Sequence, residues 1–304
     1  MAIKLGSSDI SKVYLGATEV SKIYLGSTEV YSAASPFITT WRTTGTNETI
    51  TIPTTGAGYN YDITTSDGQT FTGETGDKTI TFATAGDYDV EISGDFPRIY
   101  FNNGGDNLKL VDIVQWGSIA WTSFSVAFYG CNSLTTTSVT DAPDLSNVTD
   151  ISNMFLRCQE LITLDFSNWD VSNVTNMSNM LQRNLDLTTL AVSNWDVSNV
   201  TNMNQMLRNT DSITDYLLSN WNINKVTDFG AFMVFTGMST SSYDAILIGW
   251  EATLQTEFPS GTGYTPTISI DFGGSKYTGG GAAATARSSL VSNFGWTIVD
   301  GGIA

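Results

Sequence analysis

A repeat of 26 residues in the middle of the chain limits the folds that this sequence can adopt. Residues 169–177 read W-D-V-S-N-V-T-N-M, and the same nine letters return at residues 195–203. Looser copies begin at Trp221 and, with Pro in the place of Trp, at Pro143. A unit this short cannot bury its own apolar face, so neighbouring copies must stack to form a common core. We expect about five tandem units between residues 105 and 235.

The apolar positions within the unit indicate which side chains face that core. One set opens a strand-like stretch, in which alternate side chains can point inward. Two further sets lie three residues apart, as on one face of a short helix. These sets, with the valine that follows each Trp, are Leu161, Leu187 and Ile213; Met177, Met203 and Phe229; Met180, Met206 and Phe232; and Val174, Val200 and Val226. The pattern predicts a leucine-rich-repeat-type solenoid.

The composition excludes much catalytic chemistry. The 304 residues include no histidine, so no imidazole is present as the base of a Ser-His-Asp or Cys-His site or as a zinc or iron ligand. We therefore expect no enzyme activity and no cofactor. The formal net charge is −17, from 13 basic and 30 acidic side chains. Because nucleic-acid affinity depends largely on Lys and Arg, nucleic acid is not an expected partner.

The repeat also carries a resemblance to a known family. The W-D-V-S-N-V-T-N-M unit, followed by M-L or M-F, and Cys158 three residues before Leu161 resemble the BspA-like leucine-rich-repeat family of bacterial surface and phage proteins. The segments at residues 243–250, 270–274 and 294–298 are similar to those that close such arrays. The resemblance implies surface display and adhesion without naming a ligand. A helix over residues 282–293, packed by Ala286, Leu290 and Val291, and a last strand over 296–299 are expected to cap the array.

Residues 36–101 show a different pattern. Short alternating runs at 49–52, 59–63, 78–82, 88–92 and 98–101 are separated by Gly-containing turns such as Ser66-Asp67-Gly68. Strands at this spacing are typical of a small β-sandwich. The segment is similar to polycystic-kidney-disease-type (PKD) immunoglobulin-like modules, with Ser66-Asp67-Gly68 where that family more often has W-G-D-G.

The first 31 residues hold three copies of a ten-residue repeat, which indicate hairpins or rungs of a narrow β-structure. The segment resembles the N-terminal segments of tailed-phage structural proteins. Its repeated apolar trios favour an attachment or oligomerisation role, because exposing these apolar side chains to water is unfavourable. The alternative is a flexible polar leader. The expected attachment residues are Val13, Tyr14, Leu15, Ile23, Tyr24 and Leu25.

Three groups of side chains are candidates for chemistry or binding. Trp169, Trp195 and Trp221, with Asp170 and Asp196, form a possible ligand surface; alternatively the Trp rings fill corners of the solenoid and the carboxylates cap turns. Cys131 and Cys158 occupy equivalent places in consecutive units, so they either form a disulfide or remain as buried thiols. We predict no catalytic residue. We also predict no metal site, because Asp62, Asp67, Asp87 and Asp89 have no EF-hand spacing.

The sequence therefore predicts a mainly β protein with short helices. Its expected parts are an attachment or oligomerisation segment at residues 1–35, a sandwich at 36–101, a solenoid at 102–250 and an α/β cap at 251–304. No secretory signal or membrane-spanning run is evident. The favoured function is a phage virion structural protein, such as a tail fibre, assembled in the host cytoplasm and exposed on the virion surface. Its expected partners are other virion proteins and a host-surface glycan or protein, with trimerisation as an option. The alternatives are a capsid decoration or head-fibre protein and a bacterial cell-surface adhesin.

Overall fold

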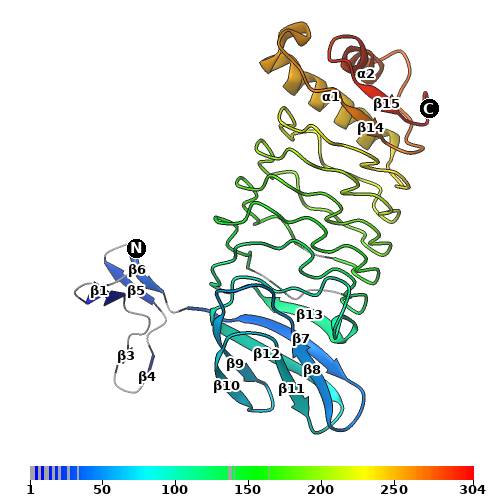
Figure 1. Ribbon diagram of the computed structural model, residues 1–304. Coiled ribbons are helices and arrows are strands. Elements are labelled where there is room, and N and C mark those ends of the chain that lie inside the picture. Colours follow the sequence, from blue (N-terminus) through cyan, green and yellow to red (C-terminus); the bar gives the residue numbers. More distant parts are fainter. Residues whose placement is uncertain are drawn as a thin grey trace.

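The computed structural model describes six short strands between residues 4 and 32, and then residues 34–135, 139, 141–163 and 165–304. The described chain is mainly β, with two α-helices near its C-terminal end and antiparallel sheets that do not close into a barrel. Figure 1 shows the order of the parts along the chain.

The decapeptide repeats form three antiparallel strand pairs. Each repeat supplies one pair, so the hairpin form of the prediction is confirmed. The pairs are β1 (Lys4–Leu5) with β2 (Ser8–Asp9), β3 (Tyr14–Leu15) with β4 (Thr18–Glu19), and β5 (Lys22–Leu25) with β6 (Thr28–Ser32).

Two antiparallel sheets follow and share one core. Their strands are β7 (Phe37–Thr43), β8 (Glu48–Ile52), β9 (Asn60–Thr65), β10 (Thr70–Glu74), β11 (Lys78–Phe82), β12 (Gly86–Asp95) and β13 (Leu110–Gln115). One sheet has the order β10-β9-β12-β7-β13, and the other pairs β8 with β11. Alternate residues of β9 and β11 are buried, as expected for strands with one face toward a core.

Two features of these sheets differ from the sequence-based expectation. The run at 98–101 is not a strand, because Phe101 instead donates its N–H to the carbonyl of Ala127. Ala127 lies in the first of the 26-residue units, which we call coils. The larger sheet also extends past residue 101, since β13 pairs with β7. Trp116, directly after β13, stacks on Phe37 with ring centroids 5.9 Å apart. The sheets and the first coil therefore share an aromatic core.

Successive 26-residue units lie on one another as stacked coils (Figure 1). The N–H of Met177 donates to the carbonyl of Asn202 at 2.9 Å, and that of Arg183 to Arg208 at 2.9 Å. On another side of the coil, Thr201 donates back to Thr175 at 2.9 Å. The backbone of each coil is therefore bonded to both neighbours, which satisfies groups that burial would otherwise leave unpaired.

The prediction of a short helix in each unit is wrong. Between Met177 and Arg183, alternate N–H groups donate to the next coil, while those between them donate within their own coil: Met180 to Met177 and Gln182 to Asn179, each at 3.2 Å. Asn179 and Arg183 adopt left-handed backbone angles, with φ of 55° and 63°. At these two residues the angles turn the N–H toward the next coil, so an α-helix cannot continue. No helix is assigned to the described residues between 116 and 239.

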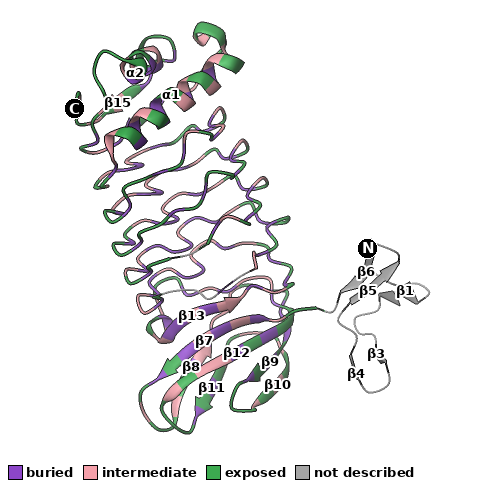
Figure 2. Ribbon diagram, turned by 180° about the vertical axis from the view of Figure 1, so that it is seen from behind, coloured by how far each residue is buried: buried purple, intermediate pink, exposed green. Residues whose placement is uncertain are grey.

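The apolar sets predicted from the sequence form the core of the stack. In Figure 2, buried stretches recur in every coil of the stack. Every member of the four sets is at most 1% exposed. At about 1.5–3 kcal/mol per fully buried large apolar side chain, this burial is the main term that stabilises the coils.

The C-terminal residues cover the last coil. The elements are α1 (Thr240–Glu257), η2 (Pro259–Gly261), β14 (Ser269–Asp271), α2 (Ala282–Ser292) and β15 (Thr297–Val299), with the short turn η1 (Asn107–Lys109) far earlier in the chain. The N–H of Met233 donates to Asp271, and β14 pairs in parallel with β15. The predicted helix at 282–293 is confirmed, but Val291 does not pack as expected, being 42% exposed. No described helix is both long and apolar enough to cross a membrane.

Candidate binding surface

The three repeat tryptophans lie inside the core. Trp169, Trp195 and Trp221 are at most 4% exposed. Trp195 and Trp221 stack with ring centroids 6.2 Å apart and an angle of 7° between their planes. Each of these two donates its Nε1–H to a carbonyl of the preceding coil, Phe166 and Val192 respectively, at 3.0 Å. The three Trp rings are therefore not part of the possible ligand surface, because rings buried between coils offer no face to a ligand.

The carboxylates beside these rings are exposed but engaged in their own turns. Asp170 Oδ1 accepts the N–H of Ser172 at 3.1 Å, and Asp196 Oδ1 accepts that of Ser198 at 3.0 Å. The hydroxyl and N–H of Ser172 hold the pKa of Asp170 below its usual value. An aspartate that bonds to the backbone two residues ahead closes a turn. These side chains therefore shape the coil corner.

The expected attachment residues lie on the hairpins of the N-terminal segment. Tyr14 and Leu15 form β3, where they pair with Glu19 and Thr18. Ile23, Tyr24 and Leu25 belong to β5. Val13 lies outside the described residues.

The two cysteines are free thiols in the core. Cys131 and Cys158 are fully buried, and Cys158 Sγ donates to the carbonyl of Phe128 at 3.2 Å. Burial raises the pKa of both thiols. Since the thiolate is the reactive form, these side chains are chemically inert packing groups.

The aspartates considered for calcium each have a different partner. They bond to the N–H of Gly73, to Thr65 and Gln69, to Arg42, and to Thr40, for Asp62, Asp67, Asp87 and Asp89 respectively. Within the described ranges, no group of three or more carboxylate or thiol residues is placed to hold a metal ion.

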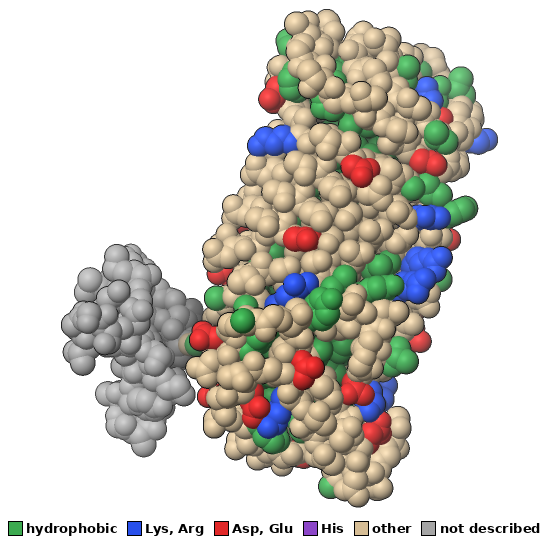
Figure 3. Space-filling model, viewed as in Figure 1, with side chains coloured by type: hydrophobic (Ala, Val, Ile, Leu, Met, Phe, Trp, Pro, Cys, Tyr) green, Lys and Arg blue, Asp and Glu red, His purple; other side chains and the backbone are tan. Residues whose placement is uncertain are grey.

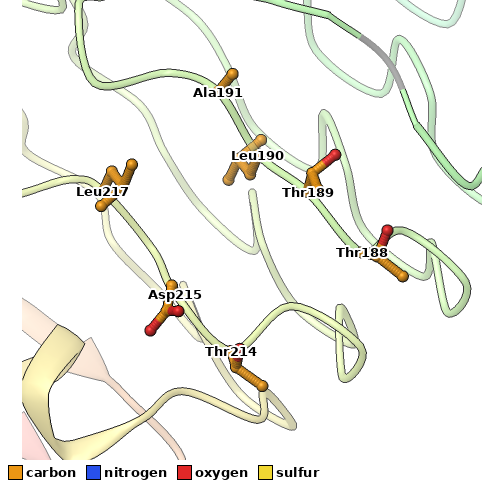
Figure 4. A pocket seen from close by; sticks show the side chains of 7 residues that line it. All are labelled: Thr188, Thr189, Leu190, Ala191, Thr214, Asp215 and Leu217. Atoms are coloured by element: carbon orange, nitrogen blue, oxygen red, sulfur yellow. The ribbon is translucent and has the colours of Figure 1, made fainter.

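The structure adds a surface that sequence reasoning missed. Two adjoining hollows open where the last coils meet the beginning of α1, and we call them together the α1 groove. The first, of about 320 Å³, lies between two coils and is lined by Thr188, Thr189, Leu190, Ala191, Thr214, Asp215 and Leu217 (Figure 4). The second, of about 390 Å³, shares Asp215 and Leu217 and adds Tyr216, Ser219, Ser241, Ser242 and Ala245.

The residues of the α1 groove gave only a weak signal in the sequence. The buried positions of the repeat stay apolar, but the exposed positions around them change: Thr163, Thr189 and Asp215 are equivalent, as are Asp165, Ala191 and Leu217. Departure from the repeat at exposed positions near its end is the pattern that could have indicated this site. The remaining surface on the face drawn in Figure 3 is mostly uncharged, with scattered charged groups.

The comparisons with known proteins concern the coils. The family described as "Mycoplasma protein of unknown function, DUF285" matches residues 122–245, about two fifths of the chain. The matched segment is the one that carries the 26-residue repeats, in agreement with the BspA-like resemblance. No curated protein and no solved structure matches the chain.

Proposed function

We propose that this chain is a non-enzymatic phage virion structural protein, in a tail fibre or another outward-facing fibre, that displays a leucine-rich-repeat-type solenoid for attachment to the host surface. One observation carries the proposal: the 26-residue coils stack in register, with backbone bonds between neighbours and a continuous core. A stack of this kind is stiff and extended, and it presents a repeated outer surface.

The parts of the chain have separate roles in this proposal. The PKD-type immunoglobulin-like module expected at residues 36–101 also takes in β13, the solenoid of about five 26-residue units follows it, and the cap begins with α1. The module closes one end of the stack through the aromatic contact of Phe37 with Trp116, and α1 closes the other. Both ends are thereby protected, as terminal units of a repeat array must be.

Residues 1–35 are the attachment segment to other virion proteins. Each hairpin has only two strands, and a two-stranded ribbon is marginal in water without a surface to pack on. A virion partner, or sister chains in a trimer, would supply that surface. Assembly inside the host would place the protein on the virion surface, and lysis of the host would then release the particles.

Deletion of residues 1–35 tests the attachment role. We expect the shortened protein to stay soluble and to retain its β-rich circular dichroism spectrum, but to be absent from purified particles. Incorporation at the normal level would reject the assignment. Replacing Tyr24 and Leu25 by Ser in the full chain is the milder variant, and it should lower incorporation in the same direction.

Competition with infection tests the display role. Purified full-length protein should bind host cells and reduce infection in a dose-dependent manner. Absence of both effects at saturating protein would overturn host attachment and favour the capsid decoration or head-fibre alternative. The match to the DUF285 family, whose description names Mycoplasma, favours the other alternative, a bacterial cell-surface adhesin. Detection of the protein on uninfected cells instead of particles would establish it.

A further inference from the structure

We propose that the α1 groove binds a neutral saccharide, with Asp215 as the hydrogen-bond acceptor for its hydroxyls and Leu217 as the apolar contact for its C–H face. The inference rests on the proposed host-attachment function and specifies the chemistry of the ligand on the host surface.

The two hollows share an exposed leucine. Leu217 is 56% exposed, whereas its neighbours Tyr216 and Leu218 are buried. In Figure 4 its side chain and that of Leu190 point into the space between their two segments. Leu190 is only 5% exposed and forms a floor there. An apolar floor with a few polar groups around it is typical of small-ligand sites.

The protein holds one carboxylate of the groove in place. Asp215 lines both hollows, and its Oδ1 accepts the hydroxyl of Ser239 at 3.1 Å. Ser239 is itself held, since it caps α1 by accepting the N–H of Ser242 at 3.2 Å. Asp215 Oδ2 accepts no hydrogen bond from the described residues. One carboxylate oxygen is thus positioned by the protein, and the other is left for a donor from outside. A charged acceptor forms the stronger class of hydrogen bond.

The charge of the lining side chains favours an uncharged ligand. Neither hollow is lined by Lys or Arg, and Asp215 is the one carboxylate among the lining residues. A phosphate or a sialic acid would meet an unpaired negative charge. A divalent cation would find one carboxylate where several oxygen ligands are needed. An uncharged molecule rich in hydroxyl donors fits these groups best.

The volumes of the two hollows suit a small ligand. Each hollow falls in the range of roughly 300–1,000 Å³ that small-ligand sites occupy, at about 320 and 390 Å³. Because they adjoin, they can take two consecutive sugar units of a surface polymer. The lining holds no indole ring, so we expect weak binding per site. Many copies on one particle would raise the overall avidity.

Saturation-transfer NMR on the full chain tests the site with defined probes. The neutral probes are galactose, glucose, N-acetylglucosamine, lactose and maltose; the anionic probes are glucose 6-phosphate and N-acetylneuraminic acid. We expect transfer to at least one neutral probe, little to the anionic ones, and at least a 10-fold loss of affinity in Asp215→Asn and Leu217→Ser. The asparagine keeps the acceptor for Ser239 and turns the other oxygen into a donor, so the fold should survive.

Matched variants separate this site from the rest of the surface. Asp211→Asn and Leu185→Ser change an exposed carboxylate and an exposed leucine outside the groove, and they should bind as the unmodified protein does. Equal binding in the groove variants, preference for the anionic probes, or no transfer to any neutral probe would overturn the proposal.

Host-cell binding distinguishes the failure of this inference from that of the proposed function. If the unmodified protein and the Asp215→Asn, Leu217→Ser double variant bind cells equally, the groove is not the contact and host attachment stands. If the unmodified protein does not bind cells, host attachment itself fails. Loss of cell binding in the double variant alone supports both.

Discussion

At the scale of single residues, the coils depend on backbone angles that most side chains disfavour. Val126, Asn153, Asn179, Gln205 and Ala231 are equivalent positions, and all have φ between 51° and 55°. Asparagine tolerates this left-handed region, whereas a β-branched residue is a clear outlier there. The strain is accepted because the first four of these residues donate their N–H to the next coil, as Val126 does to Ser152 at 2.9 Å.

Val126→Asn should therefore stabilise the protein. Replacing a β-branched residue by the asparagine found in the next two coils relieves a strain of about 1 kcal/mol, and we expect the free energy of unfolding to rise by about that amount in urea denaturation. Val126→Ile retains the branch and should leave the midpoint where it is. A loss of stability in the asparagine variant would contradict the strain argument.

Glu48 makes the stability of the folded protein depend on pH in the acid range. Its Oε2 accepts the N–H of Thr44 at 2.7 Å and of Gly45 at 2.9 Å, and Lys109 Nζ lies 3.1 Å from Oε1. These bonds lower the pKa of Glu48 from its usual 4.5 to about 2, with the N–H of Thr44 the largest cause. A lowered pKa contributes stability above pH 4.5, which is lost as the pH falls toward 2.

Denaturation midpoints measured from pH 5 to pH 2 test this dependence. The midpoint should fall more steeply for the unmodified protein than for Glu48→Gln, so that the two curves converge at low pH. Glu91→Gln, which changes an exposed carboxylate of β12, should follow the unmodified protein. Parallel curves for the unmodified and Glu48→Gln proteins would show that these bonds do not hold the carboxylate in its charged form.

At the scale of elements, α1 is held against the last coil by a close backbone approach. A methyl carbon on Gly249 would lie 2.1 Å from the carbonyl oxygen of Ser219. The next residue, Trp250, donates its Nε1–H to the carbonyl of Leu218 at 2.8 Å. This bond has the same form as those of Trp195 and Trp221, so α1 supplies the indole that a further coil would have carried.

Gly249→Ala should destabilise the protein although alanine is the better helix former. The clash with a backbone oxygen forces α1 outward, at a cost of about 2 kcal/mol, while helix propensity returns less than this. Ala252→Gly at an exposed position of the same helix should cost about 1 kcal/mol through propensity alone. If Gly249→Ala proved more stable than the unmodified protein in thermal unfolding, the close contact would be disproved.

At the scale of the whole molecule, the repeat made the stacking order and the core predictable, but local conformation was not. Met177 and Met180 are spaced as on a helix, yet the same spacing serves a chain of turns bonded three residues apart. Only the N–H partners in the next coil distinguish the two, and a local pattern does not show them. The helix α1 did have a signal, with Tyr243, Ile246, Leu247 and Trp250 at helical spacing. The α1 groove had almost none, because it joins segments from two coils and a helix.

The register of the stack can be tested by changing its length. A second copy of residues 169–194, inserted before Trp195, adds one period, so every apolar set meets its equivalent in the next coil. We expect a folded protein, longer by about 4.8 Å in small-angle scattering, with unfolding free energy no lower than before, because stability in repeat proteins grows with each interface.

Inserting only residues 169–181 adds half a period. It would bring buried methionines and valines of one coil against exposed positions of the next, and we expect aggregation. Equal tolerance of both insertions would mean that the coils are not held by matching columns, and the extended display surface proposed for this chain would lose its physical basis.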